Sequence, residues 1–119
     1  MVGSCLDVVG ESVRAQAIDL SPWGVLEHAF RSEDAIEAVN EITAAGIAVL
    51  GGDLWKQFHA RPRPAHENWH VERHPGEQWQ GYVARSQQTA LAFIQEHGTK
   101  QEVIFVLVCA DEKTYSNFV

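Results

Sequence analysis

A chain of 119 residues, 45% hydrophobic and 21% charged, has the composition of one globular domain, and we expect residues 1–119 to form a single domain. Sixteen acidic residues against nine basic residues give a formal net charge of −7, which argues against nucleic acid as a ligand because phosphate binding needs Lys and Arg. An acidic surface suits a basic protein partner, although the same charge would also serve only to keep the chain in solution.

The N-terminal segment MVGSCLDVVGESVR has no basic region and no sustained apolar run. We therefore expect neither a secretory signal nor a membrane anchor, and we expect a cytoplasmic location. Cys5 and Cys109 lie far apart without C-x-x-C spacing, so in a reducing compartment two free thiols are predicted. Because Cys109 lies in the apolar run VIFVLVCA, we expect it to be buried rather than nucleophilic.

The first two predicted elements are helices. The segment SPWGVLEHAF predicts a short helix, with Ser21 as its cap and Pro22 at its first position. A longer helix is predicted over residues 33–45, with Ser32 as its cap, acidic residues in its first turn and a stop at Gly46. The apolar stripe of this helix consists of Ile36, Val39 and Ile42.

Strands are predicted on both sides of a third helix. The branched apolar run IAVL favours a strand covered on both faces, and LWKQF and NWHVE alternate in the manner of shorter strands. Residues 59–76, rich in Pro and His, are predicted to form a long excursion. A helix over residues 77–97 ends at Gly98, and EVIFVLVCA predicts a last strand. The predicted class is α/β or α+β, with one small mixed sheet of about three to four strands packed by helices.

Residues 66–70 read HENWH and match H-E-x-x-H, a pattern of zinc peptidases. That chemistry needs a helix that places both histidines on one face, together with a third ligand. Prolines at positions 62, 64 and 75 flank the stretch, and no third-ligand pattern follows it. We predict no metal site, no cofactor and no catalytic residue, and expect any metal binding by the histidine cluster to be adventitious. A zinc-dependent hydrolase and a small-ligand-binding regulatory domain, which needs a deep apolar pocket, are the alternative functions.

Short motifs occur in a definite order along the chain. A helix and a strand precede Gly51-Gly52-Asp53 and an aromatic residue, and a loop, Asn68-Trp69, Arg85-Ser86, a helix and a strand follow. In this order, over about residues 12–108, the chain resembles the bacterial polymorphic-toxin immunity proteins of the family numbered forty.

Three positions depart from the pattern of that family. Trp55 stands where tyrosine is more frequent, Glu67 where aspartate is usual, and His70 where an aromatic residue is common. Because other members lack the two histidines, HENWH resembles a local variant of an acid-Asn-Trp motif rather than zinc chemistry.

The resemblance implies a bacterial, cytoplasmic, non-enzymatic inhibitor of a cognate toxin domain, as in contact-dependent inhibition, with no membrane or nucleic acid among its partners. Exposed aromatic residues and complementary charge would carry such binding. We expect Trp79 in the core and Trp69 nearest a surface, while a structural polar cluster of Asp53 and Asn68 is an alternative to partner contact. The predicted partner-binding residues cluster around the excursion: Asp53, Trp55, Glu67, Asn68, Trp69, Glu72 and Glu77.

Overall fold

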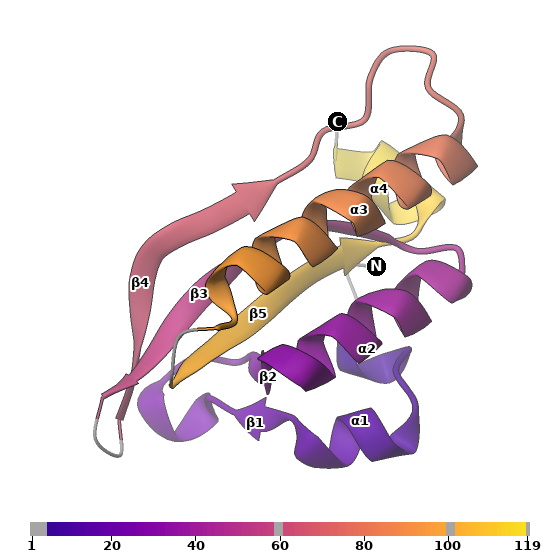
Figure 1. Cartoon of the computed structure of the whole chain (residues 1–119). Helices are drawn as coiled ribbons and strands as arrows, with labels where there is room; N and C mark the ends of the chain where they lie inside the picture. The colour runs from indigo at the N-terminus through magenta and orange to yellow at the C-terminus, as the bar shows by residue number, and fades with distance from the viewer. Residues whose placement is uncertain (1–4, 59–60, 100–101, 119) are drawn as a thin grey trace.

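The computed structural model describes residues 5–58, 61–99 and 102–118, and it confirms the α+β class (Figure 1). The described residues form short 3-10 helices (η), α-helices and five strands. In chain order the elements are η1 (Cys5–Asp7), α1 (Glu11–Gln16), β1 (Ile18–Asp19), η2 (Ser21–Trp23), β2 (His28–Arg31), α2 (Ser32–Ala44), β3 (Ala48–Phe58), β4 (Arg61–His70), α3 (Trp79–His97), β5 (Val103–Ala110) and α4 (Glu112–Phe118).

The strands form one sheet in the order β1-β2-β5-β3-β4, and every neighbouring pair is antiparallel. The sheet is therefore antiparallel rather than mixed, and it has more strands than we predicted. LWKQF and all of IAVL except Ile47 belong to the single strand β3, which pairs with β5 over most of its length. β3 and β5 are neighbours in the interior of the sheet, and α3 packs on β3.

Two predicted segments differ from the structure. SPWGVLEHAF forms only the short η2 and then β2, because the HAFR stretch pairs with β5 far along the chain. The excursion over residues 59–76 is largely β4, which forms a hairpin with β3, although positions 59–60 lie outside the described residues. As an edge strand, β4 tolerates Pro62 and Pro64, since a proline needs no hydrogen-bonding neighbour on its outer side.

Helices α2 and α3 follow their predicted ranges closely. Gly46 has a φ of 77°, in the left-handed region where glycine ends a helix readily, and Gly98 caps the end of α3. Ser32 is the first residue of α2 rather than its cap, and its hydroxyl donates a hydrogen bond of 3.1 Å to the carbonyl oxygen of Gly98. This hydrogen bond ties the start of α2 to the end of α3.

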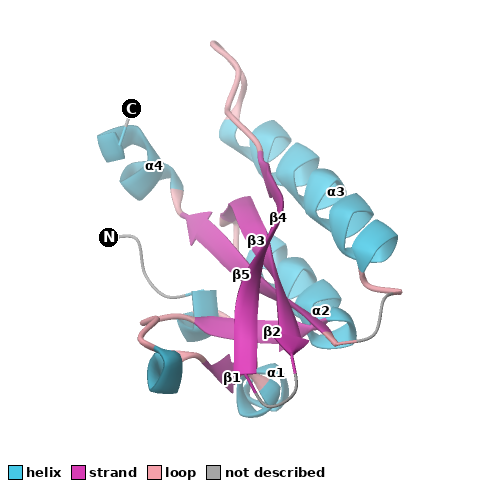
Figure 2. Ribbon diagram, turned by 90° about the vertical axis from the view of Figure 1, so that its left-hand side faces the viewer, coloured by secondary structure: helices cyan, strands magenta, loops and turns pink. Residues whose placement is uncertain are grey.

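The sheet has a helix-covered side and a more open side (Figure 2). Helices α2 and α3 bury a large apolar cluster against the first side, including Phe30, Ile42, Leu54, Tyr82, Ile94 and Phe105. A smaller cluster lies on the opposite side and contains Leu20, Ala29, Trp55, Ile104 and Val106. Within the described residues, no helix is long and apolar enough to cross a membrane.

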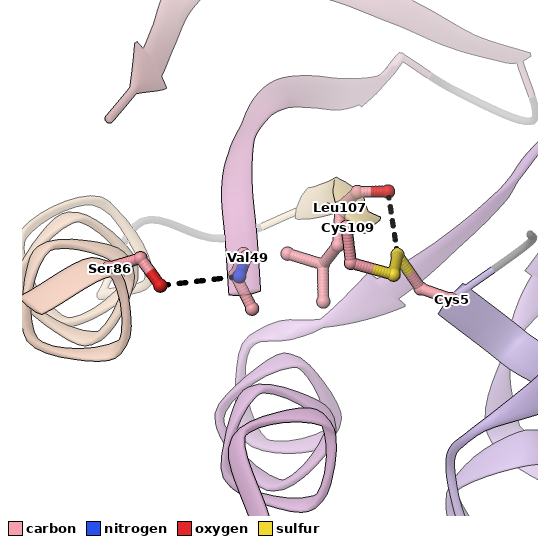
Figure 3. Close-up of a disulfide and its surroundings, with 5 residues drawn as sticks. All are labelled: Cys5, Val49, Ser86, Leu107 and Cys109. Carbon is pink, nitrogen blue, oxygen red and sulfur yellow. Dashed lines mark hydrogen bonds between the residues drawn. A yellow bond between two sulfur atoms is a disulfide. The ribbon is translucent and has the colours of Figure 1, made fainter. Parts of the chain in front are cut away.

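Cys5 and Cys109 form a disulfide, so the prediction of two free thiols is wrong (Figure 3). Packing of η1 against β5 brings their Cα atoms to 5.9 Å although they are 104 positions apart. Cys109 is buried, as predicted. The Sγ atom of Cys5 also lies 3.3 Å from the carbonyl oxygen of Leu107.

Candidate functional site

The diglycine of β3 makes room for Trp69 of the neighbouring strand. Gly52 is paired with Trp69, and a Cβ atom on Gly52 would lie 2.6 Å from Cζ3 of the indole ring and closer still to Cη2. A Cβ atom on Gly51 would collide with the carbonyl oxygen of Trp69. Trp69 packs against Phe93 of α3 with ring centroids 4.6 Å apart, and only 8% of it is exposed. Trp69 is therefore a core residue, contrary to our expectation.

Arg85-Ser86 joins α3 to the sheet and to the loop after β4. The hydroxyl of Ser86 accepts a hydrogen bond of 3.3 Å from the backbone N–H of Val49 (Figure 3). The same hydroxyl donates a hydrogen bond of 2.9 Å to the carbonyl oxygen of Val83. Arg85 donates a hydrogen bond of 2.6 Å to the carbonyl oxygen of Glu72. Both motif residues therefore have a structural role.

Glu77 completes this anchorage. Arg85 contacts both carboxylate oxygens of Glu77, at 2.9 and 2.7 Å, and the backbone N–H of His74 donates to the same carboxylate. The Arg85 hydrogen bonds, followed by that from His74, lower the pKa of Glu77 to about 2. The carboxylate of Glu77 is thus occupied within the chain and holds the loop over residues 71–78 in place.

A shallow groove of about 400 Å³ lies beside this loop, where β3, β4 and the residues around Val108 and Tyr115 meet. Its polar wall contains Asp53 and Asn68, which face each other across the β3–β4 pair, and both are exposed. The full lining is Leu50, Gly51, Gly52, Asp53, Asn68, Trp69, His70, Val71, Glu72, Val108 and Tyr115. The groove thus combines exposed acidic and amide groups with an apolar floor.

Contacts among the described residues use some of these polar groups but leave the carboxylate of Asp53 without a partner. The side-chain amide of Asn68 donates to the carbonyl oxygen of His66, and Nε2 of His70 lies 3.3 Å from Oε1 of Glu72. Within the described ranges, the side chain of Asp53 makes no hydrogen bond or ion pair. Asp53 is therefore available to an external donor.

The seven predicted site residues do not form one surface. Four of them, Asp53, Asn68, Trp69 and Glu72, line the groove. Trp55 is buried in the smaller apolar cluster, and Glu77 is paired with Arg85. Half-buried Glu67 lines a separate hollow with Lys56 and Arg63.

Sequence reasoning missed Val108 and Tyr115. Val108 is 36% exposed and is the exposed position of β5. Because the residues of β5 are almost all apolar, the sequence does not distinguish this exposed position from its buried neighbours. The hydroxyl of Tyr115 accepts a hydrogen bond of 3.0 Å from the backbone N–H of Arg73, which fixes the groove wall beside the loop. Packing of Tyr115 against the ring of Tyr82, at 5.3 Å, is a contact between segments that no local pattern indicates.

The HENWH stretch lies at the end of β4 and does not form a helix. Alternation along a strand separates residues four apart by roughly 13 Å, whereas the peptidase pattern needs them on adjacent turns. Among residues 5–58, 61–99 and 102–118, no group of three or more His, Cys, Asp or Glu side chains is placed to hold a metal ion. The local geometry is thus that of an edge strand.

These features define an α+β domain whose antiparallel sheet carries a groove with an apolar floor and a polar wall on its more open side. Residues 19–109 match the model of a protein family described as immunity protein 40, and the chain belongs to this family. The match confirms the resemblance that the ordered motifs indicate. A comparison with curated proteins finds no match.

Proposed function

We propose that this protein binds a cognate bacterial toxin domain in the cytoplasm and neutralises it by stoichiometric, non-catalytic inhibition. Membership of the immunity protein 40 family is the observation that carries this proposal. In such a system the inhibitor protects the cell that produces the toxin and its siblings. The chain itself then needs a stable surface rather than reactive groups.

The groove supplies a surface of suitable chemistry. Asp53 has an exposed carboxylate that pairs with no other described residue, and Val108 presents an exposed apolar side chain in the same groove. A basic group of the toxin would pair with Asp53, while covering Val108 would remove apolar surface from water. This combination of an apolar centre with polar groups around it resembles the binding surfaces of protein complexes.

The predicted site residues divide into two roles in this proposal. Asp53, Asn68 and Glu72 contact the toxin directly because their side chains are exposed. Trp69 shapes the groove from within the core, and Glu77 holds its adjoining loop through Arg85. Substitution of the second group would weaken binding by loosening the scaffold.

Co-expression tests the proposal. The toxin domain encoded in the neighbouring open reading frame is induced with the wild-type protein, with Asp53→Lys or with the control Glu37→Lys, which reverses an exposed carboxylate on α2. We expect the wild type and Glu37→Lys to rescue growth and to co-purify with the toxin in a one-to-one complex. Asp53→Lys should weaken the complex because it places a cation opposite a basic partner.

A further variant separates inhibition from peptidase chemistry. Glu67→Gln removes the residue that would act as the general base in H-E-x-x-H. Full rescue by this variant is expected for a stoichiometric inhibitor. Absence of both rescue and complex with the wild-type protein would refute the proposal for that toxin, and rescue that fails only in Glu67→Gln would favour an enzyme.

A further inference from the structure

The β3–β4 hairpin carries a basic surface that contrasts with the acidic character of the whole chain. Lys56, Arg61 and Arg63 are exposed on this hairpin, so it holds three of the nine basic residues of the protein. Lys56 and Arg63 are direct cross-strand partners. We call these three residues the basic arm.

The basic arm contains an unfavourable arrangement for the isolated protein. Like charges directly opposite each other on neighbouring strands destabilise a sheet, and Lys56 faces Arg63 in this way. Within the described residues, no carboxylate forms an ion pair with Lys56, Arg61 or Arg63. Half-buried Glu67 lines the same hollow as Lys56 and Arg63. An external anion would relieve the repulsion.

The arm lies on the other side of the sheet from the groove. Lys56 is paired with Val103, which belongs to the helix-side cluster, whereas Asp53 is paired with Val106 of the cluster on the opposite side. The basic arm and the groove therefore carry opposite charges and lie on opposite sides of the sheet. A partner that contacts both of them must wrap the edge formed by β4.

Prolines shape how this edge can be recognised. Pro62 and Pro64 flank Arg63 in β4, and neither has a backbone N–H to offer to an added strand. Strand addition over this part of the edge would therefore lack donors. Recognition must depend on the side chains of the arm.

We propose that the basic arm is a docking surface for an acidic segment of the cognate toxin domain, an inference that rests on the proposed function. A short acidic segment matches three cations confined to one hairpin. Nucleic acid fits less well, because a long polyanion would also meet the acidic remainder of a chain with a net charge of −7. At physiological ionic strength screening acts over roughly 8 Å, so the arm can attract a short anion locally.

Charge-reversal variants separate binding from stability. Lys56→Glu or Arg63→Glu converts the like-charge pair into an opposite-charge pair, so each single variant should raise Tm by roughly 1–4 °C. The double variant Lys56→Glu/Arg63→Glu restores repulsion with the opposite sign and should return Tm close to that of the wild type. Arg31→Glu is the matched control, because it reverses an exposed cation on β2 that has no ion pair with a described residue.

Calorimetry with the purified toxin domain measures the effect on binding. At 50 mM salt we expect each single variant to weaken binding several-fold and the double variant roughly tenfold or more, with smaller differences at 500 mM salt. Arg31→Glu should bind within about twofold of the wild type. The inference is wrong if the double variant binds as tightly as Arg31→Glu while the wild-type complex forms, and the proposed function then stands.

If the wild-type protein does not bind the toxin domain, the proposed function fails, and the basic arm is then tested with a defined acidic probe. A fluorescent deca-glutamate peptide is titrated into the same proteins at low salt, and a fluorescent single-stranded deca-thymidine is titrated in parallel. Peptide binding that is lost in the double variant but retained in Arg31→Glu supports an acidic-segment site. Equal peptide binding by both variants, or tighter arm-dependent binding of the DNA, overturns the inference.

Discussion

Replacement of Gly52 by alanine tests how the diglycine and Trp69 fit together. The new Cβ atom would lie 2.5 Å from the carbonyl oxygen of Val106 and 2.6 Å from Cζ3 of Trp69, about 1 Å inside ordinary contact distances. Forcing an extra methyl group into a packed core costs about 1–3 kcal/mol, and two close contacts favour the upper part of that range. We therefore expect Gly52→Ala to lower the free energy of unfolding by roughly 2–3 kcal/mol.

Urea denaturation followed by circular dichroism measures this loss and its origin. Trp69→Phe removes the distal ring atoms that the new methyl group would meet, so Gly52→Ala should be at least about 1 kcal/mol less harmful in that background. Gly81→Ala is the matched control, because nothing lies within 4 Å of its Cβ position in α3. Removing a helical glycine should raise stability by about 0.5–1 kcal/mol.

Two results would refute this reasoning. If Gly52→Ala is as stable as the wild type, the close approach of the two strands does not require glycine. If Gly52→Ala is equally harmful with Trp69 and with phenylalanine at that position, the indole ring is not the source of the conflict.

Three further predictions concern Ser86, Glu77 and the disulfide. Ser86→Ala leaves the buried N–H of Val49 without its acceptor and should cost about 1–3 kcal/mol in urea denaturation, whereas the exposed control Thr89→Ala should change stability far less. The pKa of Glu77 is lowered to about 2 in the folded protein, so its carboxylate stabilises the fold above its ordinary pKa of 4.5 and loses this effect as the pH falls toward 2. The Tm difference between the wild type and Glu77→Gln should therefore shrink between these two pH values. A constant Tm difference would contradict this cause. Reduction of the Cys5–Cys109 bridge should lower the Tm of the wild type but not of Cys5→Ala, with an upper limit of about 4.7 kcal/mol from closure of a loop of this length, and equal response of both proteins would refute this role.

Local patterns predicted the regular elements that extend over several turns or many residues. The apolar stripe and the glycine stop of α2 are encoded within the helix itself, and its range was confirmed. β5 is a long apolar run and was also confirmed. β2 was missed because its four residues gain their strand pairing from β5, far along the chain.

The sequence predicted those residues of the candidate groove that belong to short motifs. Asp53 and Asn68 were identified from short motifs, and the register of β3 and β4 places them opposite each other. The burial of Trp69 depends on the absence of a side chain at Gly52, a relation between two strands that neither segment shows by itself. For the same reason, the contact between Cys5 and Cys109 could not be inferred from spacing.

The central position of β5 has a consequence for synthesis of the protein on the ribosome. Arg31 of β2 pairs with Ile104 of β5, so roughly seventy further residues must be translated before β2 can meet its inner neighbour. At ordinary rates of translation this interval is roughly 4–15 s. A nascent chain that ends before β5 lacks the strand that joins β2 to β3, and it has not yet formed the groove that contains Val108. Under the proposed function, binding of the toxin by a newly made chain would therefore begin only after synthesis has passed this point.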